Sequence, residues 1–174
     1  MTIRPLDALL DLHEEVDKAA QRLAAQHADR LTCHLGCQSC CKDDLTVLEI
    51  EANRIRSAHP SLLSSGTPHP AGACAFLNDA GACRIYANRP YVCRTQGLPL
   101  RWLEPTGPDE GFEYRDICHL NDAGTPVEEL WPEQCWTIGP FEERLADLQA
   151  QVQGNDAAPK RVALRSLFDQ SATS

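Results

Sequence analysis

Residues 33–41 read Cys-His-Leu-Gly-Cys-Gln-Ser-Cys-Cys, and this stretch decides how the rest of the chain is interpreted. It holds four of the nine cysteines of the chain, in the spacing C-x3-C-x2-C-C. Cysteines that only fill a core would be scattered at helix or strand periodicity. A short loop, by contrast, brings several thiolates to about 2.3 Å from one metal at a small entropic cost. The stretch therefore predicts a metal or cluster site that uses Cys33, Cys37, Cys40 and Cys41, with Cys41 pointing away from Cys40 if the backbone is extended there.

The remaining cysteines extend this candidate site along the chain. Cys74 and Cys83 flank the turn signal Asn-Asp-Ala-Gly, which predicts a short antiparallel hairpin. Cys93 follows in Arg-Pro-Tyr-Val-Cys-Arg, where Arg-Pro predicts a turn. Cys118 and Cys135 come at longer spacings. We expect the loop and hairpin cysteines to be interleaved around one compact metal region, and Cys118 or Cys135 to complete a second centre.

Composition and charge exclude several function classes. The chain has 16 Lys and Arg against 25 Asp and Glu, a formal net charge of −9, which argues against a nucleic-acid surface and against a basic helix lying on a membrane. No apolar run approaches the roughly 20 residues of a membrane span. The first 16 residues are acidic and amphipathic, unlike a secretory signal or transit peptide. An odd cysteine count without an export signal predicts reduced thiols in the cytoplasm rather than disulfides.

Three motifs taken together resemble a known family. The order C-x3-C-x2-C-C, C-x-F-L-x5-C-x-I-Y and R-P-x-x-C-R is similar to that of the YkgJ-type cysteine-cluster family, small bacterial proteins described as zinc- or iron-chelating. The resemblance covers about residues 33–94 and implies a ligand set, namely Cys33, Cys37, Cys40, Cys41, Cys74, Cys83 and Cys93. A similar signature occurs in the flagellin lysine methylases, which are larger enzymes, and is associated there with an iron–sulfur cluster.

The number of thiolates bears on the kind of metal. Seven are too many for a single tetrahedral zinc or a single 4Fe–4S cluster, each of which takes four, whereas two centres need eight and the chain has nine. The spacing lacks the paired C-x2-4-C of zinc ribbons, so an iron–sulfur cluster is slightly favoured over Zn²⁺, and a reduced thiol site is a third possibility. Radical-SAM enzymes share C-x3-C-x2-C, but Ser39 stands where they usually have an aromatic residue, and no further βα repeats follow.

Hydrophobic periodicity predicts one α+β domain over residues 1–174, with a small irregular cysteine-rich metal core at about 33–135, a short antiparallel hairpin, and packing helices from both chain ends. The pattern predicts helices at 5–28, 48–58, 140–153 and 160–169, and a strand at 45–47. It also predicts a loop at 59–73, paired strands at 98–103 and 112–120, and a frayed tail after Asp169.

Other polar and aromatic residues near the motifs have less direct interpretations. We expect His27 to flank a helix, Asp43 and Asp44 to approach a helix or to be solvated, and Trp131 and Trp136 to cover the core or the site. His34 and His119 could be ligands, but we expect them to be exposed or to lie behind the ligands. Arg89 and Arg94 could equally offset thiolate charge or pair with carboxylates.

Three functions follow from a metal site of this kind. The first is a binding or redox module that holds an iron–sulfur cluster or zinc and serves in metal handling or electron transfer. The second is an enzyme with an open coordination position that modifies a protein or peptide substrate. The third is a structural zinc protein that recruits a protein partner.

Overall fold

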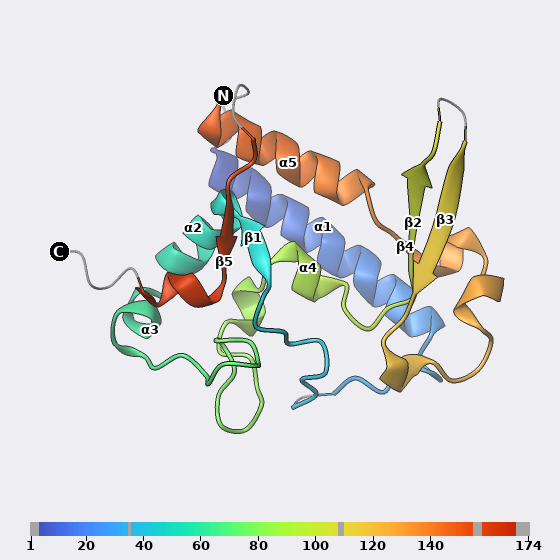
Figure 1. Ribbon diagram of the computed structural model, residues 1–174, viewed down its shortest axis with the longest axis horizontal. Helices are drawn as coiled ribbons and strands as arrows, with labels where there is room; N and C mark the ends of the chain where they lie inside the picture. The colour runs from blue at the N-terminus through green and yellow to red at the C-terminus, as the bar shows by residue number, and fades with distance from the viewer. Residues whose placement is uncertain (1–3, 35, 108–109, 155–157, 170–174) are drawn as a thin grey trace.

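Two long helices from opposite ends of the chain form one side of the molecule (Figure 1). The computed structural model describes residues 4–34, 36–107, 110–154 and 158–169. Helix α1 (Pro5–Gln26) and helix α5 (Pro140–Gln153) each begin with proline, whose fixed φ suits the first helical turn. Leu9, Leu12 and Val16 lie on the buried face of α1, in the same apolar cluster as Leu145 of α5. Both helices confirm their predicted ranges to within two residues.

A two-stranded sheet and the helix that follows its first strand pack beside the α1–α5 pair. Strand β1 (Thr46–Leu48) leads directly into helix α2 (Glu49–Ala58), as predicted, and pairs antiparallel with strand β5 (Arg161–Ala163). The central pair, Val47 and Val162, is buried in a second apolar cluster around Phe76.

The structure corrects two expected elements in this part of the fold. The expected loop at 59–73 contains helix α3 (Pro60–Ser65), because Pro60 begins a turn that buries Leu63. The expected helix at 160–169 is instead β5 followed by a 3-10 turn at Arg165–Leu167, since Val162 pairs with β1. The predicted fraying after Asp169 concerns residues 170–174, which lie outside the described residues.

A three-stranded sheet lies near the C-terminal end of α1 (Figure 1). Strands β2 (Leu100–Pro105) and β3 (Gly111–Asp116) pair antiparallel, and β4 (Trp136–Thr137) joins β2 in parallel. The pairing of the two predicted strands is confirmed, but β3 ends at Asp116 rather than at Leu120. The side chain of Asp116 accepts the N–H of Ile117, and a 3-10 turn then begins at His119.

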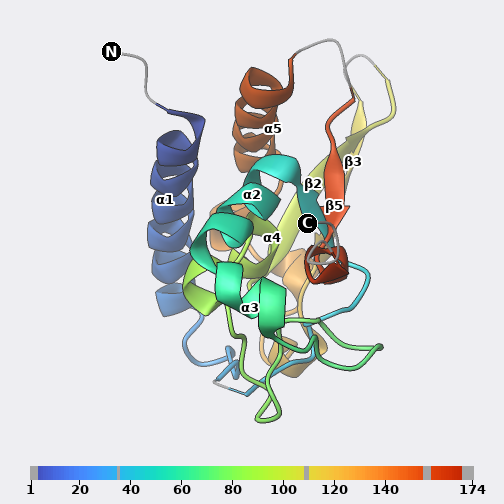
Figure 2. The same ribbon diagram turned by 90° about the vertical axis from the view of Figure 1, so that its left-hand side faces the viewer.

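Irregular segments carrying the cysteines gather at the end of the molecule away from α5 in both views (Figures 1 and 2). The predicted hairpin is reduced to a single bridge between Leu77 and Cys83, closed by a turn in which the Asn78 side chain accepts two backbone N–H groups. A 3-10 turn at Tyr86–Asn88 and helix α4 (Tyr91–Arg94) follow. None of the helices in the described ranges is long and apolar enough to cross a membrane.

Candidate metal centre

The first cysteine loop is built from turns. The N–H of Cys37 donates to the carbonyl of His34 and that of Cys41 to the carbonyl of Gln38, both at 2.9 Å. Because the chain turns at Cys40, the thiol of Cys41 donates to the sulfur of Cys40 and lowers the pKa of Cys40 to about 6. The expectation that the two adjacent side chains point apart applies to extended backbone, and the turn at Cys40 does not meet that condition.

Four cysteines from separate segments influence one another's pKa through their charges, and we call them the inner set: Cys41, Cys74, Cys83 and Cys93. The N–H of Cys74 donates to the carbonyl of Cys41 at 3.0 Å, which joins the first loop to the bridged segment. Burial raises the pKa of Cys93 to about 12, and the charges of Cys74, Cys83 and Cys40 add to this shift. The pKa of Cys41 is raised by its hydrogen bond to Cys40, by burial, and by the charges of Cys74 and Cys93.

The remaining cysteines of this region form what we call the outer set: Cys33, Cys37, Cys40 and Cys118. Burial raises the pKa of Cys33, and the charges of Cys37, Cys118 and Cys40 contribute to the shift. The side chain of Cys33 is the exposed member of the nine. Cys40 stands between the two sets, because its charge acts on Cys33 and also on Cys93.

Backbone N–H groups point at two sulfurs of the inner set. Burial raises the pKa of Cys74 and of Cys83, while the N–H of Phe76 and the N–H of Ile85, each two residues further on, lower it by hydrogen bonding. Donors of this kind stabilise sulfur when it carries negative charge. Hydrogen bonds to the ligand sulfurs are also among the features that tune bound clusters. The arrangement therefore fits thiolates that bind a metal.

A buried asparagine connects the two loops of the outer set. Asn121 is fully buried; its Nδ2 donates to the sulfur of Cys33 at 3.2 Å and to the carbonyl of Gly97 at 2.8 Å. Its Oδ1 accepts the N–H of Thr32 at 2.9 Å, and its own N–H donates to the carbonyl of Cys118 at 2.7 Å. The sequence interpretation missed this residue, whose only local signal is its place three positions after a cysteine.

Close packing around Cys33 also explains a glycine. Gly97 has a φ of +91°, and a Cβ built on it would lie 2.9 Å from the sulfur of Cys33 and 3.2 Å from Nδ2 of Asn121. A side chain here would be strained and would displace the sulfur.

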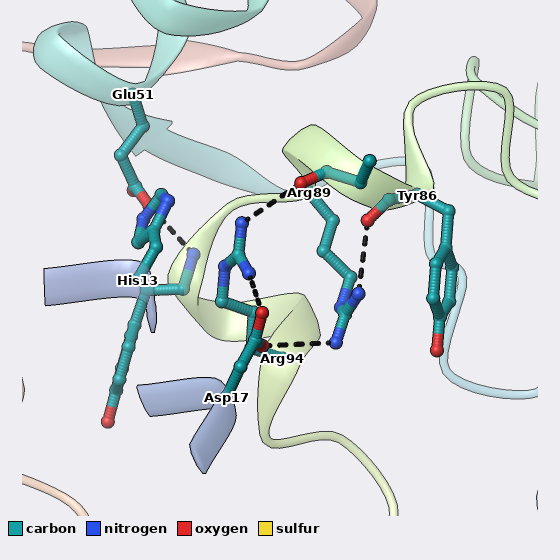
Figure 3. Close-up of polar contacts among 8 residues, drawn as sticks. His13, Asp17, Glu51, Tyr86, Arg89 and Arg94 are labelled. Atoms are coloured by element: carbon teal, nitrogen blue, oxygen red, sulfur yellow. Dashed lines mark hydrogen bonds and ion pairs between the residues drawn. The ribbon is translucent and has the colours of Figure 1, made fainter. Parts of the chain in front are cut away.

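Helix α4, which carries Cys93, is fastened by carboxylates of α1 and α2 (Figure 3). Asp17 accepts hydrogen bonds from Arg89 at 3.3 Å and from Arg94 at 2.6 Å. Glu51 accepts the N–H of Tyr91 at 2.7 Å and contacts His13 at 3.1 Å. Of the two roles left open for the arginines, carboxylate pairing is what the structure shows for both.

Arg89 also acts on a thiol. Its charge and that of Arg84 lower the pKa of Cys83 against the larger, opposite effect of burial. The second role left open, compensation of thiolate charge, thus applies to Arg89 as well.

A second clamp holds the segment before Cys74. Arg165 donates to Asp43, to the carbonyl of His69 at 2.8 Å and to the carbonyl of Ala73 at 2.9 Å. Asp43 also accepts the N–H of Gly72 at 2.9 Å. The expectation that Asp43 is merely solvated is therefore wrong, because a distant arginine pairs with it.

Cys135 has different surroundings from the other cysteines. It is buried beside Val127, Leu130 and Ile117, and a guanidinium nitrogen of Arg115 lies 3.8 Å from its sulfur. The charges that act most on its pKa, after the upward effect of burial, come from arginines and a glutamate rather than from thiols.

The other singled-out side chains divide between the core and the surface. Trp136 is buried and donates to the hydroxyl of Tyr91 at 2.8 Å, whereas Trp131 is 70% exposed rather than buried against the core. His27 is buried at the end of α1 and bonds to the carbonyl of Gln134, and His34 and His119 are exposed, as expected.

The donor set agrees with a soft metal, although the thiols do not yet stand in ligand positions. Among the described residues, no three His, Cys, Asp or Glu side chains converge closely enough to coordinate one ion. Each cysteine has one side-chain torsion to the sulfur, with three staggered wells, so rotation about Cα–Cβ can move each sulfur without moving the backbone.

Comparison with known proteins places the chain through a family model rather than through an individual relative. No curated protein and no solved structure matches the chain. The model of the family CxxCxxCC, whose printed description is "Putative zinc- or iron-chelating domain", matches residues 32–118. The match contains all members of the inner and outer sets and leaves out Cys135. Because it spans half of the chain, the chain belongs to the CxxCxxCC family of zinc- or iron-chelating domains.

Proposed function

We propose that the chain is a redox protein of the cytoplasm that holds two iron–sulfur clusters, one on the inner set and one on the outer set. When bound, such clusters accept and release single electrons. The residues of the chain position the thiolates, donate hydrogen bonds to them and limit the access of water. Of the two metals in the description of the family, the proposal selects iron, and it assigns to the bound iron a role in electron transfer.

The proposal is supported by the charge effects among the thiols, which group eight cysteines into two sets of four once Cys40 is assigned to the outer set. Each set has the four thiolates that a 4Fe–4S cluster or a closed zinc site requires. The division runs between Cys40 and Cys41, so one peptide bond connects the two sets. Two centres at such close range suit the passage of electrons from one to the other.

Two further features favour clusters over zinc. The first loop has the spacing C-x3-C-x2-C rather than the paired spacing of zinc ribbons. The sulfurs of Cys33, Cys74 and Cys83 also receive N–H donors, which in iron–sulfur proteins adjust the reduction potential. The ninth cysteine, Cys135, is assigned to packing in this proposal.

Anaerobic purification followed by analysis for iron, zinc and acid-labile sulfide tests the metal. We expect a brown protein with iron and sulfide in equal amounts and broad visible absorption that dithionite bleaches. A colourless protein with stoichiometric zinc and no sulfide would refute the redox function and leave a structural zinc protein.

Single substitutions test the ligand sets. Cys37→Ser in the outer set and Cys83→Ser in the inner set should each remove about half of the bound metal. Cys135→Ser is the matched control and should keep the full content. Loss of metal from the control, or full retention by both other variants, would contradict the assignment.

A further inference from the structure

A cavity of about 460 Å³ lies between the second half of α1 and the segment that follows α4. Its floor is α1, where Ala20 and Ala24 are four residues apart and so share one helix face, continued by Ala28 in the turn that follows the helix. Leu31 and Leu98 add apolar wall. Small side chains on a rigid helix leave room here for the apolar body of a ligand rather than for the protein's own side chains.

The polar wall of this cavity has an excess of positive charge. Arg89 and Arg94 both line it, and they share a single carboxylate, that of Asp17 (Figure 3). The side chain of Arg94 is only 4% exposed. In a chain with a net charge of −9, a wall with two guanidinium groups and one carboxylate differs from the average surface.

The third wall connects the cavity to the outer set. Cys33, the exposed cysteine, lines the cavity together with Gly97 and Gln96. A ligand in the cavity would therefore contact the outer set directly, whereas the inner set is more deeply buried.

We infer that the cavity binds a small organic carboxylate, with its negative group toward Arg89 and Arg94 and a short apolar body along the alanine face of α1. The formal excess of one positive charge among the lining side chains suits a single carboxylate better than a phosphate ester, which carries more charge, and it disfavours cations. The inference takes one element from the proposed function, namely that a metal centre is bound at Cys33. It adds the chemical class of a substrate or effector, because a carboxylate in this position would lie beside the outer cluster.

Isothermal titration calorimetry on the purified full chain tests the inference with hippurate, which combines a carboxylate, an amide and one apolar ring. Its neutral amide, N-benzoylglycinamide, is the matched ligand. We expect saturable binding of hippurate and at least tenfold weaker binding of the amide. Equal binding of the two ligands, or no binding of hippurate, would overturn the inference.

Variants then locate the site. Ala24→Met should fill the floor and weaken hippurate binding at least tenfold, whereas Ala25→Met, the next residue on the same helix and exposed, should bind as the wild type does. Gln96→Trp fills the cavity from an exposed loop position and provides a second test if Ala24→Met folds poorly. Unchanged binding in a folded filling variant would place the ligand elsewhere and refute the site.

Metal analysis of the same samples separates this inference from the proposed function. Loss of hippurate binding by Ala24→Met at unchanged metal content supports the cavity as the site. Hippurate binding is measured without reference to colour or redox activity, so a zinc-containing protein that binds hippurate would refute the iron–sulfur function while supporting the cavity.

Discussion

Single polar side chains, rather than the cysteines alone, set the positions of the sulfurs. The amide of Asn121 uses both of its ends, on Thr32 on one side and on Gly97 and Cys33 on the other. A buried amide with this many partners is costly to remove, because each orphaned group costs about 1–3 kcal/mol. Its hydrogen bond to Cys33 makes it a positioning residue for the outer set.

Replacement of Asn121 by Ala should therefore weaken the outer set specifically. We expect metal affinity there to fall by about 10- to 100-fold, the usual effect of removing a partner behind a ligand. Competition with a chelator measures this, and Asn53→Ala, which removes an amide that bonds Arg56 on α2, is the control. Equal affinities in the two variants would mean that Asn121 has only a structural role.

Two glycines with the same backbone conformation give a matched pair at this scale. Gly97 and Gly124 have φ values of +91° and +90°, but only the Cβ built on Gly97 meets other atoms. Both Ala variants should lose about 1 kcal/mol or more from backbone strain. Gly97→Ala should in addition lose metal from the outer set, as measured by stoichiometry; the same loss in Gly124→Ala would show that strain alone is responsible.

At the scale of elements, short segments depend on ion pairs that connect distant parts of the chain. Strand β5 is held to α2 by Glu49, which accepts from Lys160 and Arg56, both at 2.7 Å. Burial alone would raise the pKa of Glu49, but these two hydrogen bonds outweigh it and the pKa is lowered.

This pair predicts a pH dependence. A carboxyl group whose pKa is lowered on folding stabilises the fold fully above its unfolded pKa, near 4.5, and loses this contribution as the pH falls through the folded value. Glu49→Gln should therefore have a lower Tm than the wild type at pH 7, and the difference should shrink below about pH 4. Thermal denaturation of both proteins at each pH measures it, with the exposed Glu128→Gln as control. A difference as large at pH 3 as at pH 7 would contradict the assignment.

The clamp before Cys74 gives a prediction for the inner set. Arg165→Ala removes the bonds to Asp43 and to the carbonyls of His69 and Ala73, so the segment before Cys74 loses its restraint. We expect reduced metal content in the inner set and normal content in the outer set. Arg161→Ala, in which the lost bonds go to Thr46 instead, should keep both. Equal metal content in the inner set of the two variants would refute the role of Arg165 in restraining the segment before Cys74.

The sequence predicts the long elements well and the connections between them poorly. Helices α1 and α5 follow from periodicity, because their apolar faces extend over many residues. The grouping of the cysteines depends on contacts that no local pattern encodes. The amide of Asn121 meets Thr32 across 89 positions and Arg165 meets Asp43 across 122. Cys135 and Cys118 both stand apart from the cysteine motifs, and their spacing along the chain does not distinguish them, whereas their surroundings in the fold do.

At the scale of the whole molecule, the cysteine sets lie between three apolar clusters. Cys74 and Cys83 pack against the cluster around Phe76, whereas Cys93 follows Tyr91 of the cluster on α1. Cys118 follows Ile117, which packs on the cluster that contains Cys135. Metal bound to both sets would therefore connect all three clusters.

Removal of metal should accordingly destabilise the entire fold. Binding energy at a structural metal is folding energy, so we expect chelation to lower the Tm by more than about 10 °C. Cys37→Ser should lower it by less, because the inner set stays loaded. Differential scanning calorimetry of the loaded and chelated protein measures the change. An unaltered Tm after complete metal removal would show that the three apolar clusters hold together without the metal.

The clamp by Arg165 has a consequence for the order of events in synthesis. Arg165 follows every cysteine in the chain, yet it restrains the segment before Cys74. Because a chain is synthesised in sequence order, all nine cysteines are made before the residue that arranges Cys74. Ions captured during that interval meet an unarranged loop, so correct loading of the inner set is an event of the completed fold rather than of the nascent chain.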